Sequence, residues 1–435
     1  MVKHYIWSYN PIDIDAYMYD YIANKNNFSF VNFYENGMTE ERKSCGYSLC
    51  LQNYTAIHTT YDEAVDVVKN CSDTIHIFFG LLTPMNRRLL RYLKDCKRDN
   101  KIFIVSERYN AFGNSLEKRA KELIRWFDYK KLSRELNNVI DGFFAYGTKG
   151  AEFFKKLGFT HVSPTMYATN HHYNIRTYTL LDAVHPPAGH ALRCALGYTL
   201  LDEVHPPAGH TSRCALGDSY SNRTEKTRFI YVGRLEFDLK GVDILLKSLD
   251  TIIHRGEGRK EWSIDFVGNY GANSADVNRW IDAHCEYARQ VGKIPFDQMI
   301  HYLHGYDVCI IPSRKEGYHT LPAQCIAAGI ACIVTKGCVS DELIERYKSG
   351  IVVSSGDGKQ LSDAIMFCIT DKEAIDKMKR CAEQAAPDIS MEAVGDYMWS
   401  VIQCRINKSS SIPECPWSKK IARAKEHSRE LEREE

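Results

Sequence analysis

The stretch "YDVCIIPSRKEGYHTLPAQCIAAG", residues 306–329, decides how the second half of this chain folds. Its apolar run at 307–312 is typical of a strand that is buried on both faces of a parallel sheet. Four polar or charged residues follow at 313–316, and a helix of small residues is predicted to begin near Thr320. The first N–H groups of a helix can bind anions. The pattern therefore favours a strand–loop–helix unit that holds a phosphate and a sugar over a loop that only connects two elements.

The same alternation of apolar runs and amphipathic stretches recurs along the whole chain. Strands are predicted at 4–9, 28–34, 74–80, 101–107 and 141–147, and again at 228–234, 262–268, 307–312, 330–335 and 350–354. Such a rhythm predicts α/β domains with parallel sheets covered by helices. A chain of 435 residues is too long to fold around one ordinary hydrophobic core, so we expect two Rossmann-like domains in series.

The predicted organisation has five parts. They are an amino-terminal domain at 1–176, an interdomain linker at 177–226, a carboxyl-terminal domain at 227–387, a helix at 388–408 that packs back on the first domain, and a charged tail at 409–435. Its final stretch, residues 418–435, mixes both charge signs and is interpreted as a solvated helix, with a contact to a partner or a membrane surface as the alternative.

The linker contains a tandem repeat. Residues 178–197 and 198–217 differ at only three of twenty positions, which indicates a recent duplication and not a solenoid. Each copy carries two histidines and a cysteine, and these are His185, His190, Cys194, His205, His210 and Cys214. The residue types allow a zinc site, but the Pro-Pro-Ala-Gly centres favour exposed loops and the spacing fits no standard finger.

Composition excludes several classes of protein. The chain has 44% hydrophobic and 26% charged residues, which is typical of a globular protein. Its net charge is +1, so no broad positive potential that would attract nucleic acid is expected. No apolar signal core begins the sequence, and no window approaches a membrane span. The fifteen cysteines include no C-x-x-C pair, so we expect reduced thiols in a cytoplasmic protein.

A second group of polar residues occurs in "YVGRLEFDLKGVDIL", residues 231–245. Gly233 and Arg234 end a predicted strand, and Lys240 precedes a predicted helix. Arginine offers a fork of donors to phosphate oxygens and lysine adds a point charge. Together with Glu316, which can accept hydrogen bonds from sugar hydroxyls, these residues predict a sugar-diphosphate site where strand ends meet.

The segment 227–355, with its ordered "VGRLEFDLKGVDILLKSL" and "PSRKEGYHTLPAQCIAAG" motifs, resembles the GT-B glycosyltransferases of family 4, the retaining group related to glycogen and sucrose synthases. More weakly, "IFIVSERYNAFG" is similar to bacterial members that act on surface polysaccharides. The resemblance implies a nucleotide-sugar, UDP- or GDP-linked, on the carboxyl-terminal domain and a saccharide or lipid-linked acceptor on the amino-terminal domain. It also implies a role in polysaccharide synthesis and a reaction that needs no metal. Peripheral contact with the inner face of the membrane is a further option.

The resemblance assigns roles to individual residues. Arg234 and Lys240 would neutralise the departing diphosphate and Glu316 would contact the donor sugar, which makes them the catalytic candidates. The donor-binding candidates are Gly233, Gly317, Tyr318, His319, Thr320 and Gln324. On the acceptor side, Glu107 and Arg108 follow a predicted strand, although a structural ion pair is an equal interpretation for Glu107.

The chain also departs from the family pattern. Gln324 stands where the second glutamate of the E-x7-E motif falls, and no glycine-rich loop follows the first strand. Two other functions therefore stay open: a sugar-nucleotide or glycan-binding protein without turnover, and a nucleotide-sugar epimerase on the same fold.

Overall fold

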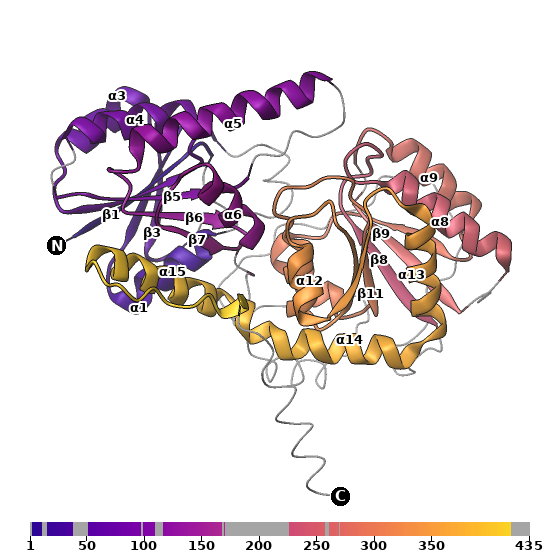
Figure 1. The fold of residues 1–435 in the computed structure, drawn as a ribbon. Helices are drawn as coiled ribbons and strands as arrows, with labels where there is room; N and C mark the ends of the chain where they lie inside the picture. Colours follow the sequence, from indigo (N-terminus) through magenta and orange to yellow (C-terminus); the bar gives the residue numbers. More distant parts are fainter. Residues whose placement is uncertain are drawn as a thin grey trace, which may run out of the picture. The chain divides into compact units, whose positions relative to one another are not determined.

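The computed structural model describes residues 2–10, 15–37, 51–96, 99–108, 116–167, 169, 226–256, 261–268 and 270–418. The tandem repeat and the charged end of the tail lie outside these residues. Residues 1–172 and 226–435 belong to one unit of the chain, in which two parallel sheets form two lobes (Figure 1).

The amino-terminal lobe has a seven-stranded sheet in the order β3-β2-β1-β4-β5-β6-β7. Its elements are β1 (Lys3–Ser8), α1 (Ala16–Asn26), β2 (Phe30–Tyr34), β3 (Tyr54–His58), α3 (Tyr61–Lys69), β4 (Thr74–Phe79), α4 (Pro84–Cys96), β5 (Lys101–Ser106), α5 (Leu116–Leu136), β6 (Gly142–Tyr146), α6 (Thr148–Lys156) and β7 (Val162–Thr165). In Figure 1, α3, α4 and α5 cover one face of this sheet, and α1 and α15 lie on the other.

The carboxyl-terminal lobe has a six-stranded sheet in the order β10-β9-β8-β11-β12-β13. Its elements are β8 (Thr227–Val232), α8 (Val242–Arg255), β9 (Trp262–Val267), α9 (Ser274–Ala283), β10 (Ala288–Val291), η1 (Phe296–Gln298), α10 (Met299–Leu303), β11 (Val308–Ile311), α11 (Leu321–Ala327), β12 (Ala331–Thr335), α12 (Asp341–Tyr347), β13 (Gly350–Val353), α13 (Gly358–Thr370) and α14 (Lys372–Ala385).

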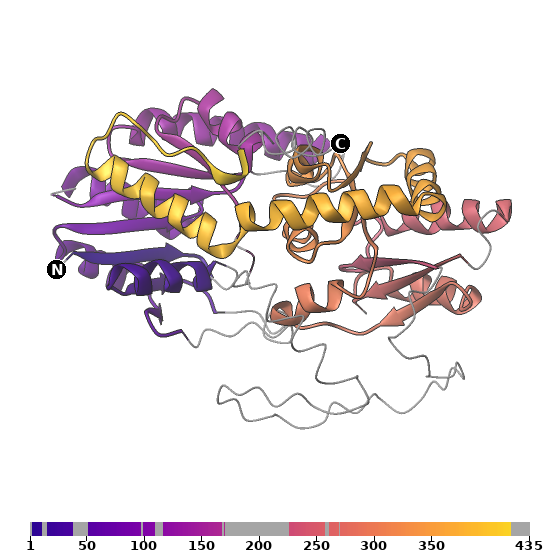
Figure 2. The same cartoon turned by 90° about the horizontal axis from the view of Figure 1, so that it is seen from below.

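After α14 the chain returns to the first lobe through η2 (Ala386–Ile389) and α15 (Met391–Ile406) (Figure 2). Helix α15 begins at Ser390, whose side chain accepts a hydrogen bond from the N–H of Ala393. It packs on α1, where Lys25 Nζ lies 2.7 Å from an oxygen of Asp396. Within the predicted tail, Trp417 of η3 (Pro416–Ser418) is buried, with its ring 5.4 Å from that of Tyr397.

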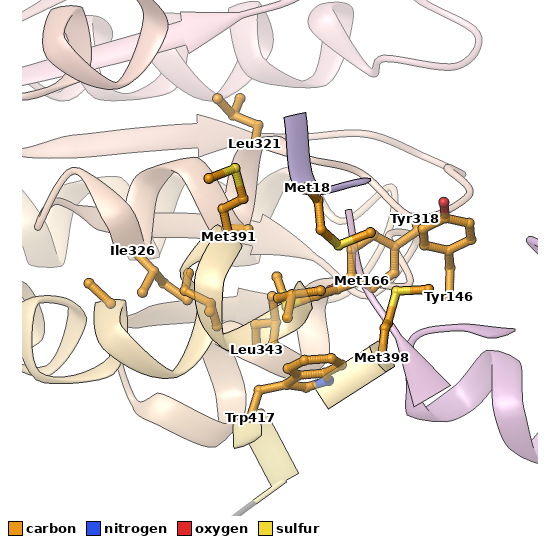
Figure 3. Packing of buried hydrophobic residues seen from close by; sticks show 14 of the residues in the cluster. Met18, Tyr146, Met166, Tyr318, Leu321, Ile326, Leu343, Met391, Met398 and Trp417 are labelled. Carbon is orange, nitrogen blue, oxygen red and sulfur yellow. The ribbon is translucent and has the colours of Figure 1, made fainter. Parts of the chain in front are cut away.

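One hydrophobic cluster joins the inner faces of the two lobes (Figure 3). Tyr146 and Met166 of the amino-terminal lobe share this cluster with Tyr318 and Leu343 of the carboxyl-terminal lobe. The ring centroids of Tyr146 and Tyr318 are 6.0 Å apart. Apolar side chains of both lobes thus pack around Tyr318, in the backbone that follows β11.

The ten predicted strands are all present, and the structure adds β3, β7 and β10. These three lie at the edges of the sheets. Edge strands are half solvated, so their sequences need no continuous apolar run. In β3 and β10 only the first residue is buried, which explains why the pattern of apolar residues did not reveal them.

Candidate active site

The loops after β8 and β11 meet at one edge of the carboxyl-terminal sheet. Strand β11 pairs directly with β8, while β9 and β10 continue the sheet on one side and β12 and β13 on the other. The chain order therefore reverses between β8 and β11. Parallel sheets bind their ligands in the crevice that such a switch point opens beyond the carboxyl ends of the strands.

Lys240 and Glu316 come from these two loops and form an ion pair. Lys240 Nζ lies 2.5 Å from Glu316 Oε1, and the two side chains are only 13% and 15% exposed. Ser313 donates a second hydrogen bond to the same oxygen, over 3.1 Å. Burial opposes ionisation of Glu316, but the neighbouring His319 and Lys240 outweigh it and lower the carboxyl pKa.

His319 completes this cluster as a hydrogen-bond donor. Burial, together with the Lys240 ammonium, lowers the pKa of His319 to about 4, so the ring is neutral at pH 7. The N–H of Leu321 donates to Nδ1 over 3.2 Å, which leaves the ring proton on Nε2. That Nε2 lies 3.4 Å from Lys240 Nζ and 4.0 Å from Glu316 Oε1. Two donors therefore stand side by side next to one carboxylate, an arrangement that suits a phosphate oxygen.

Arg234, which follows β8, binds a carboxylate outside this cluster. Its guanidinium is 2.9 Å from Glu236 Oε1, and its side chain is 42% exposed. The hydroxyl of Tyr231 donates to the carbonyl of Arg234 over 2.7 Å. Burial raises the pKa of Tyr231, and the negative charges of Glu316 and Glu236 raise it further. Of the three predicted catalytic residues, the structure brings Lys240 and Glu316 into contact, whereas Arg234 pairs with Glu236.

Glu107, at the end of β5, reaches the same backbone from the amino-terminal lobe. Its carboxylate accepts a hydrogen bond from the N–H of Tyr318 and lies against Gly317, where a side chain would collide with it. Burial raises the pKa of Glu107 to about 7; the hydrogen bond from Tyr318 opposes this rise, and the charge of Glu316 adds to it. Glu107, which was predicted to lie on the acceptor side, thus accepts a hydrogen bond from Tyr318, which was predicted to bind the donor.

Comparisons with known proteins agree with this geometry. Residues 226–371 match the family model "Glycosyl transferases group 1", so the predicted glycosyltransferase domain is confirmed for this segment. Two solved structures are similar, each with a TM-score of 0.61. HepE of Anabaena in complex with UDP is 11% identical over 92% of this chain and 100% of that one, and sucrose-phosphate synthase of Thermosynechococcus elongatus is 12% identical over 94% of this chain and 100% of that one. The fold is GT-B. The predicted fold class is confirmed.

A curated relative matches a smaller part of the GT-B chain. Glycogen synthase of Mycobacterium tuberculosis is 24% identical over 190 residues. The match covers 41% of this chain and 41% of the synthase, so the chain spans less than half of the length of the curated relative that it matches.

Arg314 is a positioning residue that the sequence motifs did not single out. Its guanidinium binds Asp243 through both carboxylate oxygens, at 2.6 and 2.7 Å, and also donates to the carbonyl of Phe237. Burial opposes ionisation of Asp243, but the pairing with Arg314 outweighs it and lowers the pKa. Because Lys240 lies between Phe237 and Asp243, this clamp fixes the loop that presents the ammonium group. The sequence does offer one signal for it, because Arg314 is one of the four polar or charged residues that follow the predicted strand at 307–312.

Two further carboxylates from α12 bind the start of α6, and no sequence motif points to either of them. Glu342 accepts hydrogen bonds from the N–H groups of Thr148 and Lys149, at 2.7 and 3.4 Å. Asp341, which is 2% exposed, lies 2.6 Å from Lys149 Nζ. Nothing in the local sequence indicates this pairing, because the two helices belong to different lobes.

The remaining predicted site residues are placed as follows. Thr320 precedes α11 without a side-chain cap, and the N–H of Leu321 is taken by His319. Gln324 is buried in α11. Arg108 is exposed, with its guanidinium carbon 5.0 Å from the centre of the Phe153 ring. Their predicted contacts with a ligand stay predictions.

No group of three metal-ligating side chains occurs in the part of the chain that the structure describes. The six histidines and cysteines of the tandem repeat lie outside that part. Among the described helices, none is long and apolar enough to cross a membrane. The described cysteines are all free thiols.

Proposed function

We propose that this GT-B chain is a glycosyltransferase that moves a sugar from a nucleoside diphosphate sugar, UDP- or GDP-linked, to a hydroxyl of a saccharide or lipid-linked acceptor. The reaction retains the configuration of the sugar, requires no metal, and serves polysaccharide or glycoconjugate synthesis in the cytoplasm. The observation that supports it most is the cluster of Lys240, His319 and Glu316 at the switch point, inside the segment that matches the glycosyltransferase model. The similar HepE structure was solved with UDP, which also supports a nucleotide-linked donor.

In the proposed reaction the donor diphosphate lies against Lys240 and the Nε2–H of His319. These donors stabilise the negative charge that develops as the bond between the sugar carbon and the phosphate oxygen breaks. Glu316 holds Lys240 in place and accepts a hydrogen bond from a sugar hydroxyl. The acceptor hydroxyl attacks the same sugar carbon from the face that the diphosphate leaves, forms the new glycosidic bond and gives its proton to the departing phosphate oxygen. Arg234, which is half exposed, turns from Glu236 to the outer phosphate.

The test begins with a screen for donors. The full chain is mixed with UDP, GDP and their sugar conjugates, and the unfolding midpoint is followed, because a ligand that binds only the native state raises it. Release of nucleotide is then measured with and without candidate acceptors. We expect Lys240→Met to lower acceptor-dependent release by about 100- to 1,000-fold.

The matched control is Lys247→Met, which removes an exposed lysine from α8 in the same part of the chain. Equal activity of Lys240→Met and the control would contradict the proposal. Saturable nucleotide binding without release would instead identify a binding protein, and an altered sugar that stays on the nucleotide would identify an epimerase.

A further inference from the structure

Glu107, the first residue after β5, extends a carboxylate from the amino-terminal lobe to the backbone beside the proposed donor site. This carboxylate accepts a hydrogen bond from the N–H of Tyr318. Gly317 lies against it, and a Cβ at that position would collide with it. The two backbone positions connect Glu316 to His319, which both belong to the cluster that the proposed reaction uses. A charge on Glu107 is therefore close to a diphosphate that this cluster binds.

The protonation state of Glu107 sets the net charge of the proposed donor site. Lys240 and Glu316 form an ion pair at 2.5 Å, so their charges cancel. The ring of His319 is neutral, because burial and the Lys240 ammonium lower its pKa to about 4. With a protonated Glu107 these four side chains are neutral overall, and with an ionised Glu107 they carry one negative charge. Like charges repel strongly where water is excluded, so the ionised form opposes the binding of a diphosphate.

Three further groups near this carboxylate, in the part of the chain that the structure describes, do not supply a compensating positive charge. Lys315 binds Glu122 of α5, with 2.7 Å between nitrogen and oxygen. The guanidinium carbon of Arg108 lies 5.0 Å from the centre of the Phe153 ring. Burial raises the pKa of the Tyr318 phenol far above its usual value, so this hydroxyl stays neutral. The negative charge of an ionised Glu107 therefore acts on the donor site without compensation from these neighbours.

The surroundings of Glu107 place its titration in the neutral pH range. Burial raises its pKa to about 7, the hydrogen bond from Tyr318 opposes this rise, and the charge of Glu316 adds to it. At pH 7 about half of the molecules therefore carry the proton. A bound diphosphate brings further negative charge to the same place, and this favours the protonated form.

We infer that the donor diphosphate and a proton on Glu107 bind together, so that the protonated carboxyl belongs to the donor-binding form and the ionised carboxylate excludes the diphosphate. The proton comes from solvent when the donor binds and returns to solvent when the nucleotide leaves. This is a role in donor binding, distinct from the predicted acceptor-side role of Glu107. The inference rests on the proposed function, since it places a nucleoside diphosphate sugar at the Lys240 cluster.

The test is isothermal titration calorimetry of the full chain with UDP-glucose and GDP-mannose, neither of which has a group that titrates between pH 6 and 8. Apparent affinity scales with the fraction of molecules in the binding-competent form, so the wild-type Kd should be about tenfold higher at pH 8 than at pH 6. At pH 8, buffers of different ionisation enthalpy should report uptake of roughly 0.9 proton for each nucleotide sugar bound. Glu107→Gln should bind with the same Kd at both pH values, close to that of wild type at pH 6, and should take up no proton.

The matched control is Glu152→Gln, which neutralises an exposed carboxylate on α6 of the same lobe and should keep the wild-type pH dependence. Similar unfolding midpoints at pH 5 would show that both variants fold.

Equal wild-type affinity at pH 6 and 8, or a pH dependence that Glu107→Gln retains, would overturn the inference and leave the proposed function intact. Loss of binding by Glu107→Gln at pH 6 would also overturn it, because glutamine reproduces the protonated carboxyl and only a structural role would then remain. Absence of binding of both nucleotide sugars at both pH values would contradict the proposed function, and the inference with it.

Discussion

Replacing Glu107 by glutamine should make this protein more stable at alkaline pH. The pKa of Glu107 is raised from 4.5 to about 7 in the folded chain, chiefly by burial. The folded state therefore retains a proton that the unfolded state loses between pH 4.5 and 7, and stability falls as pH rises through this interval. A pKa difference of one corresponds to about 1.4 kcal/mol, so the ionised carboxylate costs up to about 3 kcal/mol above pH 7.

Glutamine has the same shape and its amide oxygen can still accept the hydrogen bond from the N–H of Tyr318. The substitution removes the charge that faces Glu316 and therefore the cost of ionisation. Allowing for partial solvation of the side chain, we expect a gain of about 1–3 kcal/mol at pH 8, which raises the unfolding midpoint of a 435-residue chain by roughly 1–3 °C. At pH 5 most of this gain disappears, because the carboxyl of Glu107 stays protonated in the native wild-type protein.

The assay is thermal unfolding of the wild-type chain and of Glu107→Gln at pH 5 and pH 8. The matched control is Glu373→Gln, which neutralises an exposed carboxylate on α14 and should change the midpoint little at either pH. A Glu107→Gln midpoint equal to or below that of wild type at pH 8 would refute the reasoning. A gain of the same size at both pH values would also refute it, because the gain would then not come from ionisation.

Three further substitutions test the supports of the site. Gly241→Ala should destabilise the fold by about 2 kcal/mol or more in urea unfolding, because φ is +65° and the new Cβ would collide with the carbonyl of Pro312. Arg314→Lys should lower the rate of nucleotide release while binding of the nucleotide persists. The new lysine cannot bind both oxygens of Asp243, so the loop that carries Lys240 is held less firmly. Glu342→Ala should lower the unfolding midpoint by an amount equivalent to about 1 kcal/mol, because the first turn of α6 loses its acceptor; an unchanged midpoint would show that water replaces the carboxylate.

The buried strands could be read from the sequence because each carries its own signal. Runs such as residues 308–311 are apolar on both faces, and this pattern needs no tertiary partner to be recognised. The pairing of Lys240 with Glu316 was also within reach, since residues that follow parallel strands of one sheet meet at the same edge. By contrast, the edge strands and the partners of Arg314 depend on neighbours that no local pattern specifies.

The sequence by itself determined two parallel-sheet lobes and the loops that carry the cationic and acidic groups, because hydrophobic periodicity and strand–loop–helix order are local properties of a chain. Only the tertiary structure decided which of these groups touch. The pairing of β11 with β8 brought Lys240 to Glu316, and the packing of the amino-terminal lobe brought Glu107 to the amide of Tyr318. Distances, burial and pKa values depend on that packing, since desolvation and Coulomb interactions act through space and not along the chain.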